Sequence, residues 1–305
     1  GAEMCIRDRK GPLSLRTVAA GESDDPIDPT CLCRVCAQFS RGYIRHLFNK
    51  HEMKPSRRIA LTVEYDGTNY QGFQLQSNKP TIQGELEEAL ERLTQQSIRV
   101  RGASRTDSGA HALGQVGDFK VSAKLETNQF IRGLNFYLPK DIGIQSADEV
   151  SEAFNSRKHA LTRVYRFNIV NLPHQSPLKR YTHHWIKEIL DINIMRDAAK
   201  ELIGSLDFRN IAANYPHEVN TIRIVKRWEI WREDETIIID SEANGFLRHQ
   251  IRRVNSILVN FGKGKWQKDI LHETLISGFP FGWKPPSLPS KGLCCLLYTS
   301  DAADE

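Results

Sequence analysis

The sequence predicts an α+β fold made of two ferredoxin-like halves with a mixed, mostly antiparallel sheet. Short β-rich segments with alternating apolar residues recur along the chain, and amphipathic segments with helical spacing separate them. The order strand, helix, strand, strand, helix, strand occurs in 53–160, and a similar order follows in 161–296. We see no sequence repeat between the halves, only this similar order of elements.

Spacing and turn residues define the elements of the first half. Residues 57–65 alternate as a strand does, and Asp66-Gly67 end that strand in a turn. Thr81 is the predicted N-cap of a helix over 81–95, whose apolar residues recur at helical spacing. The remaining predicted elements are strands over 97–105, 113–121 and 142–147 and a helix over 127–138.

In the second half, a predicted helix over 246–261 carries most of the chemical signal. It has one apolar stripe, and four basic side chains lie off that stripe: Arg248, His249, Arg252 and Arg253. These residues either contact phosphate or form a solvated face. The other predicted elements are strands over 165–170, 222–231, 236–243 and 292–296 and helices over 191–203 and 267–276.

Composition excludes several classes of protein. The chain has 305 residues, of which 40% are hydrophobic and 26% charged. These values are ordinary for globular proteins and unlike those of collagen, coiled coils or disordered chains. No run approaches the roughly 18 apolar residues of a membrane span, and no signal peptide is recognisable. We therefore expect a cytoplasmic protein.

The interval 54–293 is moderately basic, with 34 Lys/Arg against 27 Asp/Glu and a net charge of +7. This charge suits a partner that bears phosphate, although a merely soluble surface would also account for it. All six cysteines lie outside the interval. We therefore expect no disulfide, no thiol nucleophile and no cysteine-bound metal within it.

The two ends of the chain differ from the middle. Residues 1–10 and 297–305 lack periodicity and resemble peptides translated from sequencing-adapter DNA, with a natural disordered tail as the alternative. Residues 11–53 contain Cys31, Cys33 and Cys36 in the spacing C-x-C-x-x-C, which suits a zinc site that still needs a fourth ligand.

This segment resembles the zinc-binding region of queuine/guanine tRNA-ribosyltransferases, but it lacks a histidine at that family's fourth ligand position. We expect 1–52 to be a foreign or disordered leader and 297–305 an artefactual tail. A functional zinc module and a natural bifunctional fusion are the alternatives for the leader. A zinc-dependent base-exchange enzyme is not expected, because the catalytic barrel of that family is absent from the sequence.

One carboxylate stands out in the middle of the chain. Asp107 lies in the predicted loop between two strands, with Arg105 two residues before it and small residues around it. Small residues let a large flat substrate approach the backbone, and a lone carboxylate in such a cleft can act as a nucleophile or a base. The alternative is a structural aspartate that caps a turn.

The segment around this carboxylate, RTDSGAHALGQV over 105–116, resembles the R-T-D-x-G-V-H-A-x-G-Q-V motif of the tRNA pseudouridine synthase A (TruA) family. Further similar segments follow in order over the rest of 54–293: YDGTNYQGFQLQ (65–76), PTIQGELEEAL (80–90), GLNFYLPKDI (133–142), FNSRKHALTRVYRF (154–167), GSLDF (204–208), NTIRIV (220–225), NGFLRHQIRRV (244–254) and LPSKGL (288–293). The resemblance implies the pseudouridine synthase fold, and it implies a homodimer that isomerises uridine in the anticodon stem-loop of tRNA, at positions 38–40. It also implies that neither a metal nor a cofactor takes part.

The resemblance also implies roles for individual residues. Asp107 matches the catalytic aspartate, Tyr165 matches a tyrosine beside the base, and Arg252 matches an arginine that pairs with the carboxylate. The expected substrate-binding residues are Arg105, His111, Arg248, Arg253 and Leu293. The chain departs from the family pattern at Ala110, Gly117 and Arg253, where valine, a bulkier residue and asparagine are usual.

The chemistry of pseudouridine formation agrees with these residues. The C1′–N1 bond breaks, the uracil turns and C5 joins the sugar, so that no electrons or groups enter or leave. The sequence leaves open whether Asp107 attacks the sugar, attacks the base or assists deprotonation at C2′. The competing hypothesis is an RNA-binding module of the same fold without catalysis.

Overall fold

The computed structural model describes residues 7–8, 11–12, 40, 56–267, 269–280 and 284–299. The chain divides into two compact units, 1–56 and 57–305. In the first unit, β1 (Arg7–Asp8) pairs antiparallel with β2 (Gly11–Pro12). The C-x-C-x-x-C segment at 31–36 lies outside the described residues, so its predicted zinc ligands remain a prediction.

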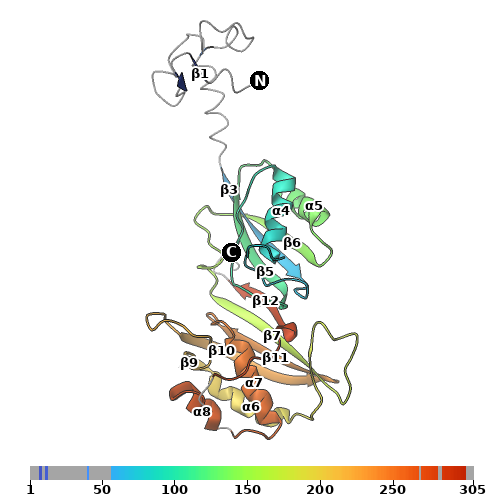
Figure 1. Ribbon diagram of the computed structural model, residues 1–305, viewed down its shortest axis with the longest axis vertical. Coiled ribbons are helices and arrows are strands. Elements are labelled where there is room, and N and C mark those ends of the chain that lie inside the picture. The colour runs from blue at the N-terminus through green and yellow to red at the C-terminus, as the bar shows by residue number, and fades with distance from the viewer. Residues whose placement is uncertain are drawn as a thin grey trace. The chain divides into compact units, whose positions relative to one another are not determined.

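The second unit contains the predicted strands and helices (Figure 1). Its strands are β3 (Arg57–Tyr65), β4 (Arg101–Gly102), β5 (His111–Val121), β6 (Ile142–Val150), β7 (Thr162–Asn171), β8 (His184–Ile186), β9 (Gly204–Asp207), β10 (Ile222–Glu233), β11 (Thr236–Ala243) and β12 (Leu293–Thr299). Its helices are α4 (Ile82–Thr94), α5 (Thr127–Tyr137), α6 (Ile192–Ala199), α7 (Gln250–Gly262) and α8 (Asp269–Ile276), with 3-10 turns η2 (Lys200–Leu202) and η3 (Ser290–Gly292).

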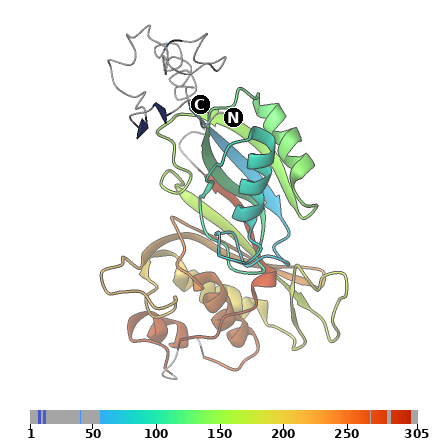
Figure 2. The same cartoon turned by 45° about the horizontal axis from the view of Figure 1, so that its top comes forward.

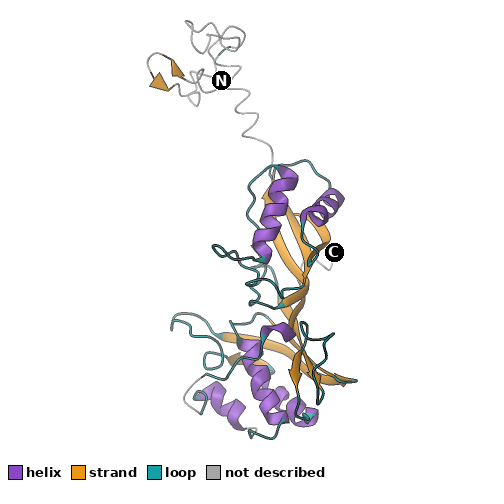
Figure 3. Cartoon of the chain, turned by 45° about the vertical axis from the view of Figure 1, so that its right-hand side comes forward, coloured by secondary structure: helices purple, strands orange, loops and turns teal. Residues whose placement is uncertain are grey.

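The strands form one continuous sheet in the order β6-β3-β5-β12-β7-β11-β10-β9, with β4 paired to β5 and β8 paired to β7. Most pairs are antiparallel, whereas β12 runs parallel to β5 and β8 runs parallel to β7. The predicted α+β class with a mixed, mostly antiparallel sheet is confirmed. The last strand, β12, joins the two halves, and Figure 3 shows strands continuing from one half into the other.

Amphipathic helices cover the sheet and enclose the core. Figure 2 shows α4 and α5 over the strands of the first half, and buried side chains of α4 and β3 belong to one hydrophobic core. Thr81 caps α4 as predicted, because its side chain accepts a hydrogen bond from the Gly84 amide. In the second half, α6 and α7 pack against each other, and α6 contacts β10.

Several boundaries differ from the sequence prediction. The helix expected over 246–261 begins only at Gln250, because His249 adopts a left-handed conformation with φ 64°. The strand expected from 113 begins at His111, and the strand expected over 97–105 shrinks to β4. The last strand continues beyond Leu296 to Thr299, and its added residues pair with β7. The apolar and aromatic side chains of Leu297 and Tyr298 favour this extended pairing.

Candidate active site

The loop between β4 and β5 presents Asp107 on a tight turn. The Ala110 amide donates to the Asp107 carbonyl over 3.1 Å, and the Gly109 amide donates to the Tyr70 carbonyl over 3.2 Å. Gly109 has φ 76°, a left-handed conformation that glycine adopts without steric cost. Gly72 lies against this loop so closely that a Cβ there would stand 2.5 Å from the Thr106 carbonyl oxygen. The small residues noted in the sequence therefore shape the turn and its packing.

Arg252 of α7 brings the two halves together at this carboxylate. Its Nη1 donates to Asp107 Oδ2 over 2.7 Å, and its Nε donates to the Leu288 carbonyl over 2.6 Å. The two charged side chains are 15% and 25% exposed for arginine and aspartate, so the ion pair is partly shielded from water. The second contact fixes the guanidinium, and the guanidinium in turn fixes the orientation of the carboxylate.

His249 stands beside the other carboxylate oxygen. Its Nε2 lies 3.9 Å from Asp107 Oδ1. Burial lowers the pKa of His249, and the charges of Arg252, Arg248 and Arg253 lower it further against the opposing effect of Asp107. The sequence placed this histidine off the apolar stripe, as a phosphate contact or part of a solvated face, and did not predict its position beside Asp107. Its left-handed backbone conformation has no signature in the sequence.

Tyr165 of β7 lies in a buried hydroxyl cluster. Its hydroxyl shares a hydrogen bond of 2.7 Å with Ser104 Oγ, which also bonds the Tyr298 hydroxyl. The Tyr165 ring meets Phe246 edge-on at a centroid distance of 5.5 Å. Burial raises the pKa of Tyr165 well above its usual range, so the phenol stays protonated near neutral pH.

The segment 288–293 closes the site from the second half. The Leu288 amide donates to the Arg252 carbonyl over 3.2 Å. Ser290 Oγ donates to the Ser108 carbonyl, immediately after the catalytic candidate in the chain. Leu293 begins β12 opposite Phe167 and is 6% exposed. The segment therefore touches both the helix that carries the arginine and the loop that carries the aspartate.

The other predicted substrate-binding residues fall into two groups. Arg105 and Arg248 are exposed, and neither side chain makes a hydrogen bond or ion pair with another described residue. His111 is buried; its Nδ1 is 3.2 Å from the Gly67 amide, and its Nε2 is 2.9 Å from the Tyr181 carbonyl. Arg253 donates to the carbonyls of Ile211 and Ala212. The last two side chains hold loops in place, and their roles toward a substrate remain predictions.

Comparison with known proteins agrees with this arrangement. The sequence profile of the family described as tRNA pseudouridine synthase matches residues 61–157 and 198–296. A tRNA pseudouridine synthase A of Geotalea daltonii is 37% identical over 240 residues, which cover 79% of this chain and 98% of that protein. Its counterpart in Geobacter sulfurreducens is 38% identical over 240 residues, or 78% and 97% of the two chains.

The chain belongs to the tRNA pseudouridine synthase family, whose members isomerise uridine to pseudouridine in tRNA. A second profile, described as Queuine tRNA-ribosyltransferase, matches residues 3–61. The two resemblances noted in the sequence are thereby confirmed. The second match begins inside 1–10 and ends inside β3, so it extends beyond the segment 11–53 on both sides.

Proposed function

We propose that the chain isomerises uridine to pseudouridine in the anticodon stem-loop of tRNA, at positions 38–40, without a metal or a cofactor. The contact between Asp107 and Arg252 carries this proposal. Asp107 lies on a turn of small residues, and an arginine 145 positions away in the chain orients its carboxylate. Shielding such an ion pair from water costs desolvation energy, which a structural turn cap does not require. An oriented carboxylate is what a reaction that starts at a single carboxylate requires.

The reaction needs no partner beyond the RNA. The glycosidic C1′–N1 bond breaks, the uracil turns within the site, C1′ bonds to C5, C5 loses its proton and N1 gains one. Asp107 starts the sequence through the carboxylate oxygen that Arg252 leaves free. The protonated phenol of Tyr165 holds the flipped base by contact with its ring and supplies a hydrogen-bond donor. Phe246 provides apolar surface beside that ring, and Leu293 is the apolar residue that the resemblance assigns to the pocket.

The target uridine must leave the helical stack, which costs a few kcal/mol. Phosphate contacts at the basic surface offset that cost. We assign such contacts to Arg105 and Arg248, because both are exposed and neither is paired with another described residue. We also propose that the chain acts as a homodimer in the cytoplasm, as the resemblance implies. Within the described residues, no helix is long and apolar enough to cross a membrane.

Mapping of the product tests the proposed activity and its target together. The purified chain is incubated with tRNA transcripts that carry uridine at positions 38, 39 or 40, and pseudouridine is located by carbodiimide labelling and primer extension. We expect product at those positions and none in matched transcripts that carry cytidine there. Product elsewhere would overturn the target. Binding of tRNA without product would favour the silent RNA-binding module.

A further inference from the structure

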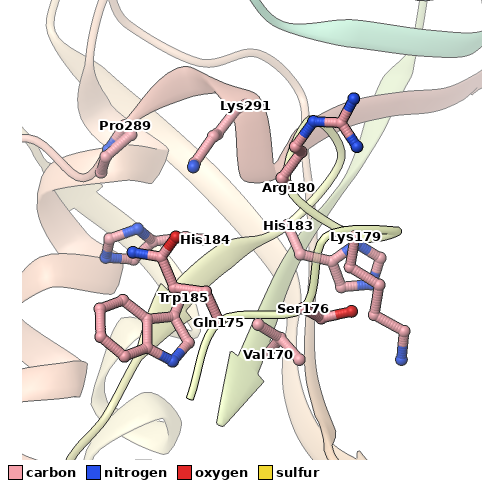
Figure 4. A pocket seen from close by; sticks show the side chains of 10 residues that line it. All are labelled: Val170, Gln175, Ser176, Lys179, Arg180, His183, His184, Trp185, Pro289 and Lys291. Atoms are coloured by element: carbon pink, nitrogen blue, oxygen red, sulfur yellow. The ribbon is translucent and has the colours of Figure 1, made fainter. Parts of the chain in front are cut away.

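A basic pocket is lined in part by Pro289 and Lys291 of the 288–293 segment (Figure 4). Its volume is about 190 Å³, well below the roughly 300 Å³ at which pockets for drug-sized ligands begin. The end of β7, the loop before β8, β8 itself and the segment at η3 supply its lining. A pocket of this size accepts a phosphate group with part of its ribose, and not a whole nucleotide.

The charged side chains of the lining are all cationic. Three cationic side chains, from Lys179, Arg180 and Lys291, line the pocket together with two histidines, and none of the ten lining residues carries a carboxylate. Lys179 is already engaged, because its ammonium binds Glu235 at 2.5 Å. Arg180 donates to the Pro177 carbonyl and lies over the Tyr181 ring.

Lys291 is the least engaged of the three lining cations. Its side chain makes no hydrogen bond or ion pair with any described residue, and it is partly buried. In Figure 4 it extends toward Gln175 and His184, whereas the Lys179 ammonium points away. Burial, together with the charges of Lys291 and Lys263, lowers the pKa of His184 to about 4. The imidazole is therefore neutral near pH 7 and adds hydrogen-bonding capacity without charge.

Hydrogen bonds join this pocket to the catalytic loop. His111 Nε2 lies 3.2 Å from the Lys291 carbonyl and 2.9 Å from the Tyr181 carbonyl. The neighbouring Ser290 donates to the Ser108 carbonyl. A group bound at Lys291 is thus held by the same short segment that contacts the loop of Asp107.

We propose that this pocket binds a backbone phosphate of the RNA close to the target uridine, with the Lys291 ammonium as its principal contact. This inference rests on the proposed function, which supplies an RNA substrate. It adds a specific anchoring point to the general basic surface. The anchor fixes the register of the strand while the target base is out of the stack.

Affinity and its salt dependence test the anchor. The dissociation constant for a tRNA transcript is measured by filter binding over a range of chloride concentrations. Lys291→Gln is compared with Lys187→Gln, which removes the same charge from an exposed residue just after β8 and outside the lining. We expect Lys291→Gln to weaken binding roughly fivefold and to reduce the slope of log affinity against log salt by about one. The control is expected to change both much less.

A competition experiment distinguishes an RNA phosphate from free phosphate. Inorganic phosphate is titrated against bound tRNA at constant ionic strength. We expect it to displace tRNA from the parent chain more effectively than from Lys291→Gln. The opposing result is that phosphate competes with tRNA on the parent chain while Lys291→Gln binds tRNA as tightly as the parent does. That pair of results would mean that the pocket takes free phosphate only, and it would overturn the proposal.

Equal effects of the Lys291→Gln and Lys187→Gln substitutions would also overturn the proposal, because the general positive charge of the surface would then explain the binding. Unchanged thermal unfolding of both variants excludes misfolding as the cause. Failure of the proposed function has a different signature, since the parent chain itself would then form no pseudouridine in tRNA.

Discussion

Arg252 is the residue on which the geometry of the site depends, because it contacts Asp107 and the Leu288 carbonyl at once. Both contacts need the forked guanidinium, which presents several donors in one plane. Lysine offers one compact ammonium on a flexible stem. It keeps the charge, but it cannot hold both partners in this geometry.

Arg252→Lys should therefore lower the rate of pseudouridine formation by on the order of 10²-fold, with a smaller loss of tRNA affinity. Arg252→Ala should lower the rate at least as much and weaken binding further, because the cation is then gone. Single-turnover rates and filter binding on the same preparations measure the two effects. A lysine variant that retains more than half of the parent rate would show that the fork is dispensable.

His184 gives a pH dependence of stability with a defined sign. Burial, Lys291 and Lys263 lower its pKa to about 4 in the folded chain, against about 6.5 in an unfolded one. Between these values the unfolded chain binds more protons, so the free energy of unfolding rises with pH across that window. As pH falls below about 6.5 this contribution is lost, and the loss levels off below about 4.

His184→Gln should remove this part of the pH dependence, which is on the order of 2 kcal/mol. Urea unfolding at pH 7 and pH 5 measures it in parent and variant without RNA. The parent is expected to lose more stability between these two pH values than the variant. An equal loss in both would contradict the partly buried, neutral imidazole.

Among the secondary-structure elements, β12 depends on a close approach of two backbones. A Cβ at Gly114 of β5 would stand 2.4 Å from the Leu296 carbonyl oxygen of β12, whereas a Cβ at Gly143 of β6 would meet nothing within 4 Å. Contact with backbone cannot be relieved by turning a side chain. An alanine at Gly114 must therefore push the two strands apart.

Gly114→Ala should lower the free energy of unfolding by about 1–3 kcal/mol. The matched change Gly143→Ala should be neutral or slightly stabilising, because alanine restricts the unfolded chain more than glycine does. Chemical denaturation of both variants measures the difference. Equal stability of the two would show that β12 does not pack against β5 as closely as described.

Local sequence patterns predicted an element well where its capping residue and apolar spacing lie within the segment itself. The helix α4 follows from Thr81 and its apolar spacing, and β11 has the predicted bounds of 236–243. The start of α7 could not be predicted, because the left-handed conformation of His249 arises from packing and not from propensity. The continuation of β12 to Thr299 depends on pairing with β7, a partner about 130 residues earlier in the chain.

At the scale of the whole molecule, the site exists only when both halves are in place. Asp107 comes from the first half, and Arg252, His249 and the 288–293 segment come from the second. No local pattern places these residues together. Their proximity was predicted only through the resemblance to a family, whereas the single sheet that joins the halves through β12 was not predicted.

A chain that begins at Met53 should form pseudouridine at the parent rate, because 57–305 is a compact unit that contains every candidate residue of the site. This expectation follows from the proposal that 1–52 is a leader foreign to the fold. Initial rates on the same tRNA, with unfolding midpoints of both chains, measure it. Loss of activity or solubility in the shorter chain would assign the leader a part in the enzyme.

The most direct test of the central claim is Asp107→Asn, compared with Asp234→Asn. Asparagine preserves size and turn formation at both positions, and Asp234 is an exposed turn residue with φ 49°. Tritium release from C5-labelled uridine in tRNA is measured beside tRNA affinity for both variants. Asp107→Asn should abolish release and leave binding nearly intact, because an amide is neither a nucleophile nor a base here and many phosphate contacts supply the affinity. Asp234→Asn should match the parent in both. Release by Asp107→Asn at more than a small fraction of the parent rate would make Asp107 a turn residue and contradict the catalytic assignment.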